Sequence, residues 1–199
     1  MTQAKDAPTY QCLLGGSFFQ NASGGPNAPI TSYNSLFLPG DGSNGNEYAG
    51  NQTYNMQFWV LLDQNPDNAP QQFVAPDAQT VPAGLAALMN SQHLLVTCLC
   101  ATSNLAPSGA LYDFMMANGS GAALTTLESL NASLACGTGG LCVYGMISIP
   151  GQGPNSGIEW FINPAPVTYA AASGTAWGGQ FPFVLMPDGA GGYVPFAQL

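Results

Sequence analysis

Basic side chains are almost absent from this sequence. Lys5 is the only lysine or arginine in 199 residues, whereas ten carboxylates give a formal net charge of −9. Nucleic-acid-binding proteins neutralise phosphates with lysine and arginine, and anionic membranes attract the same side chains. We therefore expect no nucleic-acid partner and no attraction to an anionic membrane surface.

Charge of either sign is also scarce, at 6% of residues against about 25% in an ordinary soluble protein. The hydrophobic fraction of 46% is too high for a disordered chain and sufficient for one buried core. Gly, Asn, Gln, Ser and Thr must supply the surface polarity, as they do in proteins exposed outside the cytosol or built into large assemblies. This composition favours an extracellular or virion location.

Targeting signals are missing from the first residues, MTQAKDAPTYQCLLGG, which lack a charged region followed by an apolar stretch. No run of about 18 apolar residues occurs either. Either a signal peptide was removed, or the protein leaves the cell without one. Met1 favours the second interpretation, and a virion component released by lysis fits it.

Catalytic signatures are missing as well. No serine lies in a GxSxG motif, and the single histidine, His93, lies in an apolar strand, where we expect a packed, hydrogen-bonded core residue. The loop with Gly151, Gly153 and Gly157 is similar to a dinucleotide-binding loop, but Pro154 removes an amide and β-prone residues follow. We predict a connection between two strands there, with no cofactor and no enzymatic activity.

Paired carboxylates leave one hydrolytic alternative open. Asp63 and Glu159 meet if strands 54–62 and 157–162 end at the same edge of a sheet, and glycoside hydrolysis needs two carboxyl groups facing one cleft. With ten acids in the chain, such a pair is expected by chance. The oxygen-rich loops 41–47 and 63–67 lack the Gly and Glu of an EF-hand and predict turns, so we expect no metal site.

Tryptophan offers a second alternative. Trp160 and Trp177 lie beside flexible segments, and an exposed indole ring can stack on a sugar. These two residues, with Asp63 and Glu159, are the candidate ligand-binding residues. A glycan is then the candidate ligand, and the corresponding hypothesis is a secreted carbohydrate-binding module.

Five cysteines cannot all pair within one chain. Cys136 and Cys142 flank the flexible segment GTGGL, which makes them the predicted disulfide. Cys98 and Cys100 lie two apart on an apolar strand, so their side chains share one face and are predicted to be buried thiols. His93 falls on the opposite face by parity, which argues against a zinc site with these cysteines.

Three apolar runs predict central strands covered on both faces: 54–62, 93–101 and 141–149. Amphipathic helices are predicted between them, the first beginning at Thr80, the second capped by Ser108, and a third over 121–130. The alternation of strands and helices predicts an α/β or α+β fold with a mixed sheet and two to three short helices.

The flanks are rich in Gly, Pro and Asn, and they carry short strand patterns at 11–20 and 35–38. Near the C-terminus, FPFVLM and YVPF frame the turn PDGAGG and predict a hairpin, in which Pro182 and Pro195 limit both arms to edge or irregular strands. We therefore divide the chain into an N-terminal β arm (1–50), an α/β core (51–165) and a C-terminal β-hairpin arm (166–199).

The central pattern, from MQFWVLLDQ through HLLVTCLCA and LYDFMMANG to VYGMISIPGQGPNSGIEWF, resembles the interleukin-like EMT inducer (ILEI) domain, also called the GG domain. The resemblance covers residues 52–163 and rests on element order, hydrophobicity and the glycine turn at Gly151 and Gly153. It implies a non-catalytic role in extracellular signalling, carbohydrate binding or a phage tail fibre. The basic residues common in such domains are missing, so no ligand residue is carried over.

The sequence as a whole predicts a non-enzymatic structural or recognition protein outside the cytosol, such as a virion or phage surface component. Its partners would be other copies or other proteins of an assembly, held by apolar contacts of the β arms. Exposed apolar patches favour association, and strand addition at a sheet edge needs no ion pairs.

Overall fold

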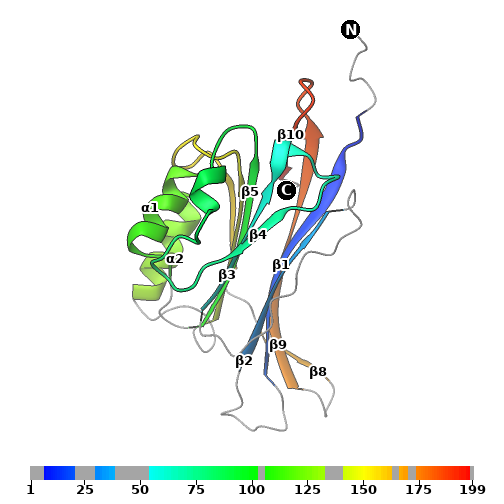
Figure 1. Cartoon of the computed structure of the whole chain (residues 1–199). Coiled ribbons are helices and arrows are strands. Elements are labelled where there is room, and N and C mark those ends of the chain that lie inside the picture. The colour runs from blue at the N-terminus through cyan, green and yellow to red at the C-terminus, as the bar shows by residue number, and fades with distance from the viewer. Residues whose placement is uncertain are drawn as a thin grey trace.

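A computed structural model describes residues 7–20, 30–38, 54–102, 106–132, 141–162, 166–169 and 174–197. These residues form three layers, with two helices on one side, an inner sheet in the middle and a second sheet on the other side (Figure 1). The predicted α+β fold is confirmed. None of the helices in the described part of the chain is long and apolar enough to cross a membrane.

The inner sheet has five strands in the order β4-β3-β5-β6-β7. The three predicted central strands are confirmed as β3 (Tyr54–Leu61), β5 (Leu94–Thr102) and β6 (Leu141–Ser148). The edges are β4 (Gln71–Val74) and β7 (Ile158–Ile162). Every described pair is antiparallel, so the predicted mixed sheet is wrong in this respect.

Burial of both faces explains why the central strands are apolar almost throughout. In β5, Leu95 and Leu99 pack toward the helices, whereas Val96, Cys98 and Cys100 pack toward the second sheet. Alternate residues of a strand point to opposite faces, so a strand between two layers needs apolar side chains at nearly every position. A strand with one wet face would alternate instead.

The helical layer consists of α1 (Gly109–Ala117) and α2 (Ala122–Ala132). Both helices were predicted, and Leu111, Met115 and Leu124 are fully buried against the inner sheet. The helix predicted from Thr80 is wrong: only a 3-10 turn forms, η3 (Leu85–Leu88). Gly84 precedes it with a φ of 83°, a left-handed conformation that interrupts a right-handed helix.

The flanks of the chain form the second sheet, which we call the flank sheet. Its strands are β1 (Tyr10–Gln20), β2 (Ile30–Phe37), β8 (Pro166–Tyr169), β9 (Gly174–Pro187) and β10 (Tyr193–Ala197). Their order is β10-β9-β1-β2, with β8 also paired to β9. The segments predicted as two separate arms therefore pair with each other, and β1 meets β9 along all of its length.

The flank sheet packs face to face on the inner sheet, opposite the helices (Figure 1). One continuous apolar cluster fills the space between the sheets and takes residues from both flanks and from the centre of the chain, including Phe18, Trp59, Cys98 and Phe183. The predicted boundaries at 50 and 165 thus do not separate independent cores. In sandwich packing, neither sheet can bury its inner face without the other.

The predicted C-terminal hairpin is confirmed as β9 and β10, and β10 is an edge strand along its length. At Pro182, β9 pairs with Leu13 of β1 on one side only, so the strand is locally an edge there. The proline is tolerated there because β8 pairs with β9 only at residues 174–177 and β10 only from residue 183 onward. In the described structure no second strand flanks Pro182, so its missing amide hydrogen costs no ladder bond.

Candidate functional site

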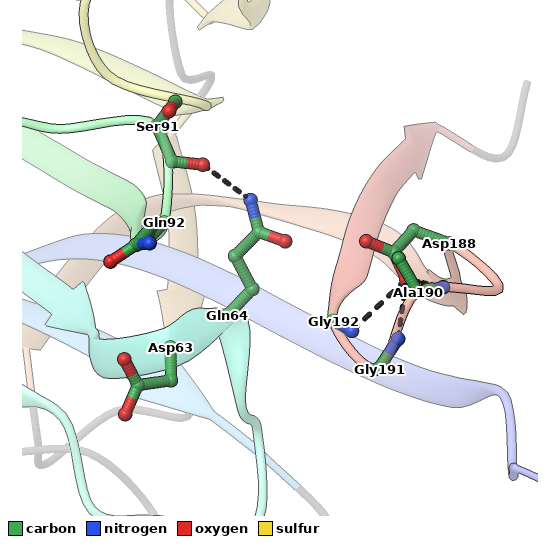
Figure 2. Close-up of a pocket in the computed structure, with 8 residues that line it drawn as sticks. All are labelled: Asp63, Gln64, Ser91, Gln92, Asp188, Ala190, Gly191 and Gly192. Carbon is green, nitrogen blue, oxygen red and sulfur yellow. Dashed lines mark hydrogen bonds between the residues drawn. The ribbon is translucent and has the colours of Figure 1, made fainter.

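A pocket of about 460 Å³ opens at one end of the sandwich, and we call it the end pocket. Three connections converge there: the turn after β3, the turn before β5, and the β9–β10 turn (Figure 2). The pocket therefore bridges the two sheets, as binding loops at the end of a β-sandwich commonly do. Its lining is polar and consists of Asp63, Gln64, Ser91, Gln92, Asp188, Ala190, Gly191 and Gly192.

The turn after β3 has an unusual backbone. Asp63 and Gln64 are consecutive non-glycine residues with φ values of 54° and 50°. Such left-handed residues cost on the order of 1–3 kcal/mol each and persist only where their surroundings hold them. His93 supplies part of this support, because its Nδ1 accepts a hydrogen bond from the Asp63 amide at 3.1 Å.

His93 was predicted to be a packed residue inside an apolar strand, and this is wrong. β5 begins one residue later, at Leu94, and His93 is only half-buried in the turn before it. The Asn90 carbonyl accepts a hydrogen bond from the His93 amide at 3.2 Å, which closes this turn. The histidine thus stabilises the wall of the end pocket.

Asp188 organises the β9–β10 turn. Its Oδ1 accepts hydrogen bonds from the amides of Ala190, Gly191 and Gly192 at 2.7, 3.0 and 3.0 Å. These amide bonds, that of Ala190 first, lower the pKa of the Asp188 carboxyl, so it is ionised at neutral pH. Gly189 and Gly191 have φ values of 79° and 110°, which a side chain rarely allows.

Gln64 and Gly192 bring the two sides of the end pocket together. The Gln64 side chain is 9% exposed, and its Nε2 donates to the Ser91 carbonyl at 3.0 Å. The other amide atom, Oε1, points toward the β9–β10 turn (Figure 2). A methyl group added at Gly192 would lie 2.4 Å from this oxygen. The absence of a side chain at Gly192 therefore allows the close approach.

A hydrogen bond between Tyr10 and Asp67 lies outside the pocket lining. The Tyr10 hydroxyl donates to Asp67 Oδ1 at 2.5 Å, and the Tyr10 ring packs on Tyr193 with a centroid distance of 5.3 Å. The hydrogen bond to Asp67 is the main cause that raises the pKa of Tyr10 far above its usual value. Asp67 thus ties the loop after β3 to the first residue of β1.

Glu159 performs a structural task. Its carboxylate accepts hydrogen bonds from the Ala123 and Leu124 amides at 3.0 and 3.3 Å, and from the Tyr144 hydroxyl at 2.7 Å. The amides at the start of a helix have no partners within the helix, and a carboxylate there also interacts favourably with the positive end of the helix dipole. Glu159 of β7 therefore caps α2.

The structure does not bring Asp63 and Glu159 together. Asp63 follows β3, and β5 and β6 separate that strand from β7, which carries Glu159. At about 4.8 Å per strand spacing, the two strands lie roughly 14 Å apart. Glycosidase carboxylates need a separation of about 5–9.5 Å. Asp63 and Glu159 therefore lack the geometry that the hydrolase hypothesis requires of them.

Trp160 is half-buried at the edge of the sandwich. Its ring stacks on Phe181 with a centroid distance of 5.3 Å and an interplanar angle of 23°, and it also contacts Phe183. One ring face is therefore occupied within the protein, which argues against a sugar platform there. The Trp177 backbone pairs with Phe18, and its side chain lies outside the described part of the structure.

The glycine loop connects β6 to β7, as predicted. Gly151 and Gly153 have φ values of 78° and 83°, and both donate to the end of α1: Gly151 to Asn118 Oδ1 at 3.1 Å and Gly153 to the Ala117 carbonyl at 3.3 Å. Both amides are hydrogen-bonded to the end of α1, so they do not form a phosphate cradle. The loop anchors the helical layer to the inner sheet.

The state of the described cysteines agrees with what the sequence predicts for them. Cys142 is disulfide-bonded, and Cys136, its predicted partner, lies outside the described residues. Cys98 and Cys100 are buried thiols on one face of β5, and each donates to a carbonyl of the flank sheet at 3.4 Å. Burial raises the pKa of the Cys98 thiol, which makes it unreactive.

Sequence reasoning identified Asp63 as a ligand-binding candidate but missed Gln64, Asp188 and Gly192. The motif PDGAGG signalled a turn, and its aspartate and glycines are the residue types that build one. No local pattern indicates that this turn faces residues more than a hundred positions earlier.

Comparison with protein-family models, characterised proteins and solved structures finds no match to this chain.

Proposed function

We propose that this chain is a non-enzymatic structural or recognition protein that works outside the cytosol, as a virion or phage surface component. It assembles with further copies of itself through the outer face of the flank sheet. The observation that carries the proposal is that this face has no charged residue, that it carries the three exposed large hydrophobic side chains of the described structure, and that no described element covers it (Figure 1).

Strand register defines the outer face. Phe181, Phe183 and Leu185 of β9 point into the core, so the residues between them point outward. All three exposed large hydrophobic side chains of the described structure belong to the outward set: Phe37 at 39%, Met186 at 43% and Phe196 at 58% exposed. The register places further apolar residues on the same face, namely Leu13 and Val194, which are half-buried, Pro182, which is exposed, and Val184, which its neighbours bury.

Charge favours a second copy as the occupant of this face. None of the flank-sheet strands contains a charged residue, although the chain carries a net charge of −9. Two copies repel each other elsewhere, but here they can approach without opposing carboxylates. A basic partner would gain nothing from this face, because it offers that partner no anion.

The cysteines support an oxidising environment. Disulfides form and persist outside the cytosol, and Cys142 is disulfide-bonded. A low-charge surface is compatible with such a location as well. The implied relation to the ILEI domain remains a prediction from the sequence.

The native mass in solution tests the proposal. We expect sedimentation equilibrium to show oligomers for the wild type and monomers for the double variant Met186→Ser, Phe196→Ser. Gln180→Ser is the matched control, since this exposed polar residue lies on the same sheet and its loss should leave the oligomer intact. Raising the salt concentration should not dissociate the oligomer, because apolar contacts are not screened.

Two results would contradict the proposal. One is a wild type that sediments as a monomer at all protein concentrations, which would leave the face to a different partner or to no partner. The other is a double variant that is folded, as judged by circular dichroism, and still forms the wild-type oligomer.

A further inference from the structure

Two polar side-chain atoms of β3, Gln57 Oε1 and Trp59 Nε1, are enclosed in the protein, and neither has a hydrogen-bond partner among the described residues. Gln57 is 1% exposed and Trp59 is fully buried. The amide oxygen accepts a hydrogen bond, and the indole N–H group donates one. Buried groups of both kinds nearly always have a partner in native proteins. These two atoms therefore require a partner from outside the chain.

The two side chains lie on the same face of β3. Trp59 belongs to the apolar cluster between the sheets, and Gln57 is two residues away, so it also points toward the flank sheet. Gln72 of β4 is the cross-strand partner of Trp59, and its Oε1 accepts a hydrogen bond from Gln57 Nε2 at 3.0 Å. This bond directs the Gln57 amide along the sheet toward Trp59. The acceptor and the donor are therefore neighbours on one face.

The surroundings of these atoms are polar but contain no charge. Asn34 of β2 is fully buried, and its Nδ2 donates to the carbonyl of Cys98, the cross-strand partner of Gln57, at 3.2 Å. None of the strands β2, β3, β4 and β5 contains a charged residue. An ion buried there would have no counter-charge, which makes its desolvation very costly. The partner is therefore a neutral group that both donates and accepts hydrogen bonds.

We propose that Gln57 and Trp59 bind one water molecule between the two sheets. The water donates a hydrogen bond to Gln57 Oε1 and accepts one from Trp59 Nε1. Globular proteins contain about one buried water per 27 residues, and two to four polar groups typically hold each of them. The water completes a hydrogen-bonded path from Trp59 through Gln57 to Gln72 on the edge strand β4. It is the group that allows an indole N–H and an amide oxygen inside an otherwise apolar cluster.

Water-selective NOE and ROE spectra of the ¹⁵N-labelled protein test the proposal. We expect the indole Hε1 of Trp59 to show a cross-peak with the water resonance, and this cross-peak should have opposite signs in the NOE and ROE spectra. That pair of signs indicates a dipolar contact with a molecule that tumbles with the protein, whereas chemical exchange gives equal signs. Trp59→Phe identifies the Hε1 signal among the three tryptophans.

A pair of matched variants connects the cross-peak to the acceptor. Gln57→Leu nearly preserves the size of the side chain but removes the amide oxygen, so the cross-peak at Trp59 Hε1 should be lost. Gln71→Leu is the control: Gln71 is exposed and pairs with Val60, which packs toward the helices, so it lies on the other face of the sheet. This variant should retain the cross-peak. The ¹⁵N spectrum reports whether each variant is folded, and Gln57→Met replaces Gln57→Leu if that variant is not.

Three outcomes overturn the proposal. The first is a wild type without a water cross-peak at Trp59 Hε1, and the second is a cross-peak of equal sign in both spectra. The third is a cross-peak that persists in Gln57→Leu, which would assign it to a nearby hydroxyl proton such as that of the buried Ser32. The site lies inside the sandwich, so these outcomes do not depend on the oligomeric state, and failure here leaves the outer-face proposal standing.

Discussion

Single residues decide how closely the layers of this protein approach each other. Gly16 of β1 faces the inner sheet at the position where Cys98 and Cys100 face the flank sheet. At Gly145 of β6, the missing side chain likewise leaves room for the side chains of Leu14 and Phe181. Glycine in a strand costs conformational entropy, and close contact between sheets offsets that cost. The composition rich in glycine thus has a packing role as well as a role in turns.

Replacing Gly16 tests this role. A Cβ at Gly16 would lie 2.6 Å from Val143 Cγ1 and 2.7 Å from Cys100 Sγ, so Gly16→Ala should destabilise the protein by about 1–3 kcal/mol. Gly15→Ala is the matched control, since its nearest neighbour is the Ser35 hydroxyl at 3.0 Å. Urea unfolding measures both. Equal stability of the two variants would show that the sheets can separate without cost.

The Tyr10 hydroxyl gives a prediction about pH. Its pKa is raised in the folded protein, mainly by the hydrogen bond to Asp67, whereas an unfolded tyrosine has a pKa of about 10. The stabilisation is therefore complete below pH 10 and is lost as the pH rises further. Tyr10→Phe should be less stable than the wild type at pH 7, and the difference should shrink above about pH 10. A difference that is independent of pH would contradict this assignment.

At the scale of elements, helices and strands are joined by polar contacts that the sequence does not reveal. The end of α1 receives the β6–β7 loop, where the Gly157 amide donates to the Gly119 carbonyl at 2.9 Å. At the start of α2, the carboxylate of Glu159 from β7 accepts hydrogen bonds from two backbone amides. Both contacts hold the short helical layer on the inner sheet. A nine-residue helix such as α1 would be unstable alone, so this docking supplies much of its stability.

Glu159 allows a test of the cap. Glu159→Ala leaves the Ala123 and Leu124 amides without their acceptor and should destabilise the protein by about 1–3 kcal/mol. Glu159→Gln keeps one acceptor oxygen but removes the charge, so its effect should be smaller. Thermal unfolding and amide exchange at Ala123 provide the measurement. An alanine variant as stable as the wild type would instead return Glu159 to the list of ligand-binding candidates.

At the scale of the whole molecule, the two ends of the chain form one sheet. Removal of the C-terminal hairpin from Gln180 onward should therefore unfold the protein. If the hairpin were a separate arm, its removal would instead release a folded monomer. β9 supplies Phe181, Phe183 and Leu185 to the core, and it is the partner of β1. Circular dichroism of the truncated chain decides the matter. A cooperative unfolding transition near the wild-type temperature would mean that the inner sheet and helices are stable alone.

The sequence by itself determined the elements whose signals are local. The double-sided burial of β5 is visible as a continuous apolar run. Ser108 and Asn118 mark the limits of α1 as predicted, although the Ser108 side chain makes no capping hydrogen bond. The PDGAGG turn and the shared face of Cys98 and Cys100 are likewise determined by residues that are close together in the sequence. The scarcity of basic residues is likewise read from the sequence alone, and it is the basis of the prediction that the chain has no nucleic-acid partner.

Only the tertiary structure decided which segments meet. β1 pairs with β9 across more than 150 residues, and no local pattern encodes the partner of a strand whose apolar face merely requires some cover. The packing of the flank sheet on the inner sheet places Asp188 and Gly192 beside Gln64. Glu159 reaches the start of α2 from β7 of the inner sheet, and therefore caps a helix and does not line a cleft. The end pocket exists because two sheets meet at one end, so its residues acquire their neighbours only when the sandwich closes.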